Sequence, residues 1–134
     1  MIEKENAYKD IKVLCLDDSS TMRRIISNTL FRVGVQKENL ELAEDGAIGL
    51  EIFRQDPQRF DIVLTDINMP VMDGYGFIQN ARRRNADVPI VCITTEGGKG
   101  EIIRALKMGA TNYIIKPFTP QILKEKLSKI IEGL

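Results

Sequence analysis

The stretch DIVLTDINMPVMDG, residues 61–74, decides which fold and which site this chain is expected to form. Its residues 62–64 are an unbroken apolar run, which is typical of a strand buried on both faces of a parallel sheet. The run leads to Asp66, and Pro70 follows. Asp66 is either a turn residue, because Asp, Asn, Pro and Gly are common in turns, or a functional group held on a rigid strand end. The choice depends on which other residues reach the same place.

On both sides of this stretch, short apolar runs alternate with amphipathic segments. Such alternation predicts a parallel sheet covered by helices on both faces. The last helix is expected to be capped by Thr119 and to begin at Pro120. The expected strands are 11–16, 40–43, 61–66, 88–94 and 112–116, and the other helices are 21–34, 46–56, 74–84 and 101–108.

The apolar content of the strands predicts their order in the sheet. The first, third and fourth strands are nearly continuous apolar runs, so both of their faces should be buried. The second and fifth strands are more mixed, as edge strands are. The expected fold class is therefore α/β, a doubly wound five-stranded sheet with the flavodoxin-like order 2-1-3-4-5 and five helices.

Length and charge limit the classes of protein and partner. The 134 residues suit one domain, which we expect at residues 10–134 after a polar N-terminal extension at residues 1–9. The formal net charge is zero, so electrostatics predict no binding of nucleic acid or of an anionic membrane. No apolar stretch is long enough to span a membrane and no signal peptide is evident, so we expect a cytoplasmic protein, and a monomer.

The residue types available restrict the chemistry further. The chain has no histidine, which excludes Ser–His and Cys–His nucleophile pairs, histidine metal ligands and phosphohistidine. Its two cysteines, Cys15 and Cys92, lie inside apolar runs and are expected to be reduced core residues.

Five polar residues follow strands that should end at one edge of the sheet. Asp17 and Asp18 follow the first strand, Asp66 ends the third, Thr94 ends the fourth and Lys116 ends the fifth. In an open parallel sheet, ligands bind at the carboxyl ends of the strands, beside the point where the strand order reverses. We therefore expect three acids, a hydroxyl and a lysine to meet in one crevice.

Three carboxylates in one crevice repel one another, and a hard divalent cation such as Mg²⁺ relieves that repulsion through oxygen ligands. Asp66 could then act as a nucleophile toward phosphorus and form an aspartyl phosphate. Phosphoryl transfer needs charge to be neutralised on the phosphoryl oxygens, which Mg²⁺ held by Asp17 and Asp18, the Lys116 ammonium and the Thr94 hydroxyl could provide.

Four segments carry this pattern in order along the chain. Each is common by itself, whereas all of them at these intervals form a specific signature. The segments are LDDSSTMRR (16–24), DIVLTDINMPVMDG (61–74), ITTEGGK (93–99) and IIKPFTP (114–120).

From about residue 11 to residue 134, the chain resembles the receiver domains of response regulators. The resemblance implies that Asp66 is the phosphoacceptor, with Mg²⁺ bound by Asp66, Asp17, Asp18 and the backbone carbonyl of Asn68. It further implies that the bond between Lys116 and the proline after it is cis.

The same resemblance assigns the remaining functional residues. Thr94 would move toward the phosphoryl group, and Lys116 would form an ion pair with it. Tyr113 would be the aromatic residue whose rotamer changes when the switch operates. Asn68 and Glu96 would tune the rate of dephosphorylation.

Among receivers, the chain is most similar to stand-alone chemotaxis proteins, since it has Asn68 two residues after Asp66 and Glu96 two residues after Thr94, and it is expected to end where the last helix of the receiver ends. The expected function is a signalling switch, not an enzyme, which catalyses only its own phosphorylation and dephosphorylation. A histidine kinase would be the phosphodonor, and the output would be altered binding to a partner, a flagellar motor switch protein. A stand-alone phosphorelay intermediate or phosphate sink is the alternative.

Two other classes of protein fit the residues less well. A haloacid-dehalogenase-like phosphatase also uses a nucleophilic Asp and Mg²⁺, but it expects a second acid where this chain has Asn68. A flavodoxin-like electron carrier would place a phosphate loop after the first strand, where Asp17 and Asp18 would repel phosphate.

Overall fold

A parallel sheet of five strands in the order β2-β1-β3-β4-β5 forms the centre of the computed structural model, which describes residues 8–134. The strand order expected from the sequence is confirmed. The strands are β1 (Val13–Leu16), β2 (Leu40–Ala43), β3 (Ile62–Thr65), β4 (Ile90–Thr94) and β5 (Asn112–Ile115). The helices are α2 (Ser20–Val33), α3 (Gly46–Gln55), α4 (Gly74–Arg84), α5 (Lys99–Met108) and α6 (Pro120–Glu132), with a short 3₁₀ helix η1 (Lys37–Asn39).

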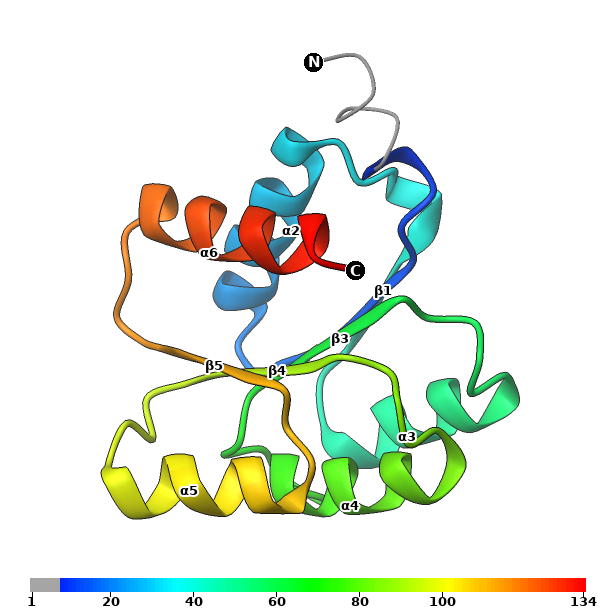
Figure 1. Cartoon of the computed structure of the whole chain (residues 1–134), viewed down its shortest axis with the longest axis vertical. Coiled ribbons are helices and arrows are strands. Elements are labelled where there is room, and N and C mark those ends of the chain that lie inside the picture. Colours follow the sequence, from blue (N-terminus) through cyan, green and yellow to red (C-terminus); the bar gives the residue numbers. More distant parts are fainter. Residues whose placement is uncertain (1–7) are drawn as a thin grey trace.

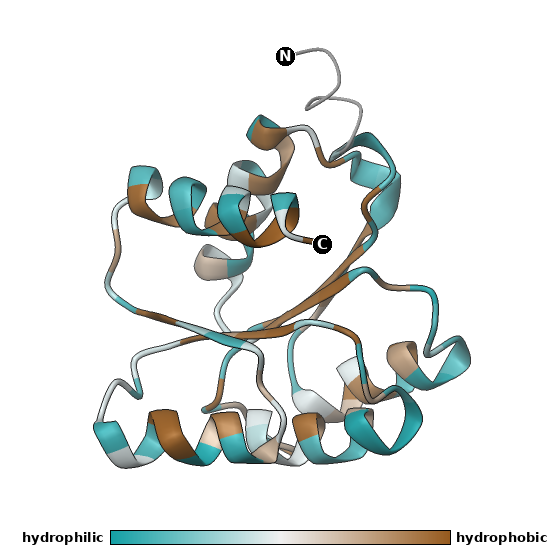
Figure 2. Ribbon diagram, in the orientation of Figure 1, coloured by the Kyte–Doolittle hydropathy of each residue, from teal (hydrophilic) through white to brown (hydrophobic). Residues whose placement is uncertain are grey.

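The helices cover the sheet on both faces. Figure 1 shows α2 and α6 on one face and α3, α4 and α5 on the other. Because successive side chains of a strand point to opposite faces, β1 contributes Val13 and Cys15 to the core under α2 and α6, and Leu14 and Leu16 to the core on the other face. The inner strands β1, β3 and β4 are accordingly strongly hydrophobic in Figure 2. Both cysteines are buried and free.

Several element boundaries differ from those expected. β4 begins after Pro89, which has no N–H to donate to a neighbouring strand. α5 begins at Lys99, two residues before the expected start at residue 101, so Gly100 lies inside the helix. The 3₁₀ helix η1 was not expected. By contrast, α6 begins at Pro120, and Thr119 caps it by accepting a hydrogen bond from the backbone N–H of Ile122, as expected.

The polar N-terminal extension was expected at residues 1–9, of which residues 1–7 lie outside the described residues. Tyr8 does not fit the expectation of a loose extension, because its side chain is buried in the core under α2 and α6. Its hydroxyl donates a hydrogen bond to Glu132 at the end of α6, at 2.6 Å. The aromatic ring at position 8 therefore extends the core beyond the expected start of the domain. Across residues 8–134, none of the helices has both the length and the apolar character that a membrane span requires.

The register of the strands aligns their carboxyl ends. Leu16 of β1 pairs with Thr65 of β3, and both strands end at this pair. The next residue of each strand is held by its neighbour: the backbone N–H of Asp66 donates to the carbonyl of Leu16 at 2.9 Å, and that of Asp17 donates to Ala43 at 3.0 Å. The backbone of the sheet thus sets the two acids side by side.

Helix α3 lies unusually close to β1 at Gly49. A Cβ atom added to Gly49 would lie 2.1 Å from Cδ2 of Leu16, which is itself buried. By contrast, a Cβ atom added to Gly100 in α5 would meet nothing within 4 Å.

These two helical glycines should respond to alanine in opposite directions. Alanine has the higher helix propensity, so Gly100→Ala should raise the free energy of unfolding by up to about 1 kcal/mol. Gly49→Ala should lower it by about 1–3 kcal/mol, because overpacking against Leu16 outweighs that gain. Urea unfolding of both variants measures the effect, and a stabilising Gly49→Ala substitution would contradict the close packing of α3 on β1.

Candidate phosphoacceptor and metal site

The centre of the site is a lysine between two aspartates. The ammonium of Lys116 lies 2.8 Å from Oδ2 of Asp17 and 3.1 Å from Oδ2 of Asp66. Lys116 directly follows β5, whereas the two acids follow β1 and β3. The ion pairs therefore join the ends of three strands, two of which are not neighbours of β5 in the sheet.

Backbone groups hold both carboxylates in place. Oδ1 of Asp66 accepts a hydrogen bond from the N–H of Ile67 at 2.7 Å, and Oδ1 of Asp17 accepts one from the N–H of Ser19 at 2.9 Å. Arg23 of α2 donates to the backbone carbonyl of Asp17 at 2.6 Å. The N-cap of α2 is Ser19, whose hydroxyl accepts a hydrogen bond from the N–H of Met22, so the side chains of Asp17 and Asp18 do not cap this helix.

A third acid, Asp18, joins this pair. One carboxylate oxygen from each of Asp17, Asp18 and Asp66 lies within 4.8 Å of the others. Asp17 and Asp66 are buried, whereas Asp18 is exposed. An open group of hard oxygen donors with one exposed member suits Mg²⁺, which keeps several of its waters when it binds a protein.

The charges of this group do not balance. Burial raises the pKa of the Asp17 carboxyl, and its contacts with Lys116 and the N–H of Ser19 offset only part of that effect. Burial by itself would lower the pKa of Lys116. The hydrogen bond to Asp17 and the negative charge of Asp66 together outweigh burial, so the pKa of Lys116 is raised and the ammonium stays charged. Among residues 8–134, Lys116 forms ion pairs with Asp17 and Asp66, and Arg23 contacts only the backbone carbonyl of Asp17, so three clustered carboxylates still favour a further positive charge.

A second group of residues lies at the mouth of the site. The side-chain amide of Asn68 donates to the carboxylate of Glu96, and the hydroxyl of Tyr113 donates to the backbone carbonyl of Glu96. Thr94 is fully buried at the end of β4, and its hydroxyl accepts from the N–H of Glu96 at 3.3 Å. Glu96 thus links the loop after β3 to strands β4 and β5.

The structure therefore brings together the residues selected from the sequence, as two connected groups. One consists of the three acids and Lys116, and the other contains Asn68, Thr94, Glu96 and Tyr113. The two are joined through β4, because the backbone N–H of Lys116 donates to the carbonyl of Thr94 at 2.8 Å. The peptide bond from Lys116 to Pro117 is cis, as the resemblance implied.

The loop after Asp66 is shaped by a glycine that the sequence pattern marked only as a helix start. A Cβ atom on Gly74 would lie 2.2 Å from the backbone oxygen of Asp66, so a side chain there would displace the loop. The N–H of Gly74 donates to the carbonyl of Ile67 at 2.7 Å, which closes the loop on itself. Within the same loop, Val71 has a φ of 69°, which is uncommon for a β-branched residue, and no sequence signal indicated it.

Sequence reasoning also missed the residues that hold Asp17. Ser19 and Arg23 contact it through a backbone N–H and a backbone carbonyl. Such contacts depend on the path of the chain, and residue type alone does not indicate them. The only sequence signal was their position in the segment that follows the two acids.

The burial of Asp17 should have a measurable cost when no divalent cation is present. Asp17→Asn removes one negative charge but keeps an oxygen for the N–H of Ser19. In EDTA at neutral pH the variant should therefore have a free energy of unfolding roughly 1 kcal/mol above that of the unchanged protein. Because folding raises the pKa of Asp17, the difference should be greatest above that raised pKa and should vanish below the ordinary value of 3.8, where the carboxyl is protonated in both states.

Chemical unfolding, measured from below the ordinary pKa of 3.8 up to neutral pH, tests this pH dependence. Asp10→Asn, at an exposed acid, is the charge-matched control. A less stable Asp17→Asn variant at pH 7 would show that the ion pair with Lys116 outweighs burial and repulsion.

Comparisons with known proteins agree with this geometry. The family described as response regulator receiver domain matches residues 13–128. The chemotaxis protein CheY1 of Helicobacter pylori is 49% identical over 123 residues, which cover 90% of this chain and 97% of that protein.

Solved structures show the same fold. Chemotaxis protein CheY4 of Vibrio cholerae superposes with a TM-score of 0.80 at 34% identity, covering 91% of this chain and 99% of that one. The CheX–CheY complex with BeF₃ and Mg²⁺ from Borrelia burgdorferi gives a TM-score of 0.86 at 22% identity, covering 95% of this chain and 97% of that one.

Proposed function

Since the chain belongs to the response regulator receiver domain family and is of the CheY type, we propose that Asp66 accepts a phosphoryl group from a histidine kinase. The observation that carries the proposal is the position of Asp66, a buried carboxylate at a strand end that contacts Lys116 and lies beside two further acids. A turn residue would need none of these neighbours. The chain acts as a signalling switch whose only catalysis is on its own phosphoryl group.

The contacts of Asp66 assign roles in the transfer. A carboxylate oxygen of Asp66 attacks phosphorus, the bond from phosphorus to the kinase histidine nitrogen breaks, and that nitrogen keeps the electron pair. The N–H of Ile67 and the ammonium of Lys116 orient the carboxylate before the attack, since both already contact it. Lys116 then balances the charge of the phosphoryl group.

The acidic group would hold Mg²⁺ through Asp17, Asp18 and Asp66 together with the backbone carbonyl of Asn68. When bound, the ion neutralises negative charge on the phosphoryl oxygens and lets the donor approach three acids. Support comes from the donor set itself, with three carboxylates within reach of one another and a single lysine against them. The complex of the Borrelia relative, which contains Mg²⁺ and BeF₃, is consistent with this assignment.

The second group would convert phosphorylation into a change of shape. A doubly charged group on Asp66 offers new hydrogen-bond acceptors, and the Thr94 hydroxyl would turn toward them and release the N–H of Glu96. Because Glu96 also holds Tyr113 and Asn68, its movement would shift the position of the Tyr113 ring. This is a population shift between two conformations, biased by charge. Asn68 and Glu96, which bridge the mouth of the site, would also control how water reaches the phosphoryl group and so tune its loss.

The output would be binding to a partner protein in chemotaxis. The relative from Helicobacter pylori is named a chemotaxis protein, and the chain covers nearly all of its length. We assign a flagellar motor switch protein as that partner and a chemotaxis histidine kinase as the phosphodonor. The receiver unit at residues 10–134, the monomeric state and the cytoplasmic location stay predictions.

Phosphorylation of Asp66 has a direct test. After incubation with acetyl phosphate and Mg²⁺, the intact mass of the unchanged protein should rise by one phosphoryl group, and that of Asp66→Asn should not. Asp61→Asn is the matched control, because Asp61 lies just before the other end of the same strand, where its carboxylate accepts from the N–H of Lys12.

Two results would refute this site. One is a mass gain that persists in Asp66→Asn. The other is no gain in the unchanged protein under conditions where added Mg²⁺ measurably raises its melting temperature. Loss of the gain in EDTA would support the role of the cation.

The partner has a separate test. Affinity for a purified flagellar motor switch protein should rise when acetyl phosphate and Mg²⁺ are added, and Tyr113→Ala should reduce the rise without preventing the mass gain. Equal binding with and without phosphorylation would favour the alternative, a phosphorelay intermediate or phosphate sink.

A further inference from the structure

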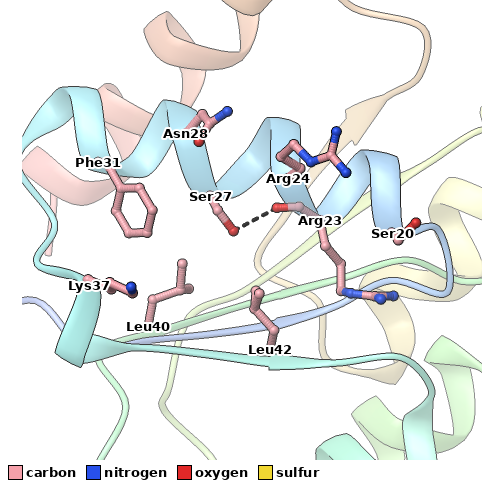
Figure 3. A pocket seen from close by; sticks show the side chains of 9 residues that line it. All are labelled: Ser20, Arg23, Arg24, Ser27, Asn28, Phe31, Lys37, Leu40 and Leu42. Atoms are coloured by element: carbon pink, nitrogen blue, oxygen red, sulfur yellow. Dashed lines mark hydrogen bonds between the residues drawn. The ribbon is translucent and has the colours of Figure 1, made fainter.

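An open groove lies between α2 and the edge strand β2, away from the phosphoacceptor. Its floor is Leu40 and Leu42 of β2, and Phe31 projects toward them from α2 (Figure 3). The hollow has a volume of about 450 Å³. Phe31 and Leu42 are 39% and 42% exposed, so apolar surface is left open to solvent here.

The topology of the sheet explains why this surface is open. β2 is an edge strand, and its one strand neighbour is β1. Leu40 and Leu42 pair in register with Val13 and Cys15, which face the core under α2, so both leucines lie on the α2 side of the sheet. Helix α2 covers the inner strands, and its residues toward β2 include the small Ser27, which leaves space above the two leucines (Figure 3).

The rim of the groove has a single sign of charge. Arg23, Arg24 and Lys37 are the charged residues among those that line it. In Figure 3, Lys37 lies at one end beside Leu40 and Arg23 extends along the groove toward the other end, whereas the guanidinium of Arg24 extends above α2 in this view. An apolar floor under a cationic rim is complementary to a segment with apolar and acidic side chains.

The groove does not stop at Leu42. Leu42 and Arg23 also line an adjoining hollow, together with Ala43, the acid Glu44 and Ile48 at the start of α3. Ile48 is a further apolar side chain that is substantially exposed. The two hollows share Arg23 and Leu42, so exposed apolar side chains extend from Phe31 past Leu42 to Ile48, with Glu44 as the one acid among the residues that line them.

Other occupants fit these observations less well. A small-molecule site shelters its apolar lining, whereas Phe31 and Leu42 are open to solvent. A nucleic acid would match the cations but not the apolar floor. A second copy of this chain carries no net negative charge to match the rim.

From these contacts we infer that the α2–β2 groove is a docking surface for an acidic segment of a partner protein that inserts apolar side chains over Leu40 and Leu42. Arg23 connects this surface to the phosphoacceptor site, because the same guanidinium donates to the backbone carbonyl of Asp17. The inference does not depend on phosphorylation of Asp66.

The probe for this surface is a short synthetic peptide of leucine and phenylalanine spaced by glutamates. Titrated into the ¹⁵N-labelled protein, it should shift the amide signals of residues 23–31 and 37–43, and high salt should weaken its binding. A peptide with lysine in place of glutamate, and one with serine in place of the apolar residues, should shift these signals much less.

Charge reversal on the rim provides the decisive comparison. Arg24→Glu combined with Lys37→Glu should weaken peptide binding about tenfold, since each change replaces an attraction by a repulsion. Arg32→Glu combined with Lys124→Glu changes the net charge equally at exposed residues that line a different hollow, and it should have little effect. Both pairs avoid Arg23 and the residues of the phosphoacceptor site.

Several outcomes would overturn the inference. Equal weakening by both charge-reversed pairs would mean that binding responds only to the net charge of the protein. Equal binding of the lysine peptide would mean that binding depends only on apolar contact. Shifts confined to other faces would place the peptide elsewhere. An oligonucleotide that shifts the same amides as strongly would show a site for polyanions. Concentration-dependent shifts of the same amides without peptide, together with a dimer in sedimentation, would show that a second copy occupies the groove.

Discussion

The ion pairs of Lys116 with Asp17 and Asp66 are the interaction on which the site depends. They are possible because β1 and β3 end at the same level of the sheet, so the next residue of each strand carries its carboxylate to one point. Backbone hydrogen bonds from Asp66 to Leu16 and from Asp17 to Ala43 hold both acids to the sheet, so their positions do not depend on a flexible loop. Rigid strand ends therefore let like charges be held together despite their repulsion.

Holding these charges together lowers stability, and the rest of the fold offsets the loss. Burial raises the pKa of Asp17, which means that the folded state disfavours its ionised form. Two apolar cores, one on each face of the sheet, supply the opposing free energy through the burial of apolar surface. A cation, or any change that redistributes the charge of the three acids, would relieve their repulsion.

Glu96 gives the site a route to the surface. Its backbone carbonyl, backbone N–H and carboxylate contact Tyr113, Thr94 and Asn68 respectively, so hydrogen bonds connect the buried Thr94 to two exposed or half-exposed residues. On the opposite side, Arg23 links Asp17 to the α2–β2 groove. A small acidic centre is thus connected to two separate surfaces through single residues.

Residue pattern alone determined the strand order, the helices on both faces and the meeting of three acids with Lys116, because apolar runs report burial and parallel strands must end at one edge. Tertiary structure alone decided what depends on the path of the backbone. The bonds from Ser19 and Arg23 to Asp17, the contact of α3 with Leu16 at Gly49, the burial of Tyr8 and the open groove over Leu42 are of this kind. Each of these features depends on how closely one element packs on another, and no local pattern of side-chain types in the sequence specifies how close that packing is.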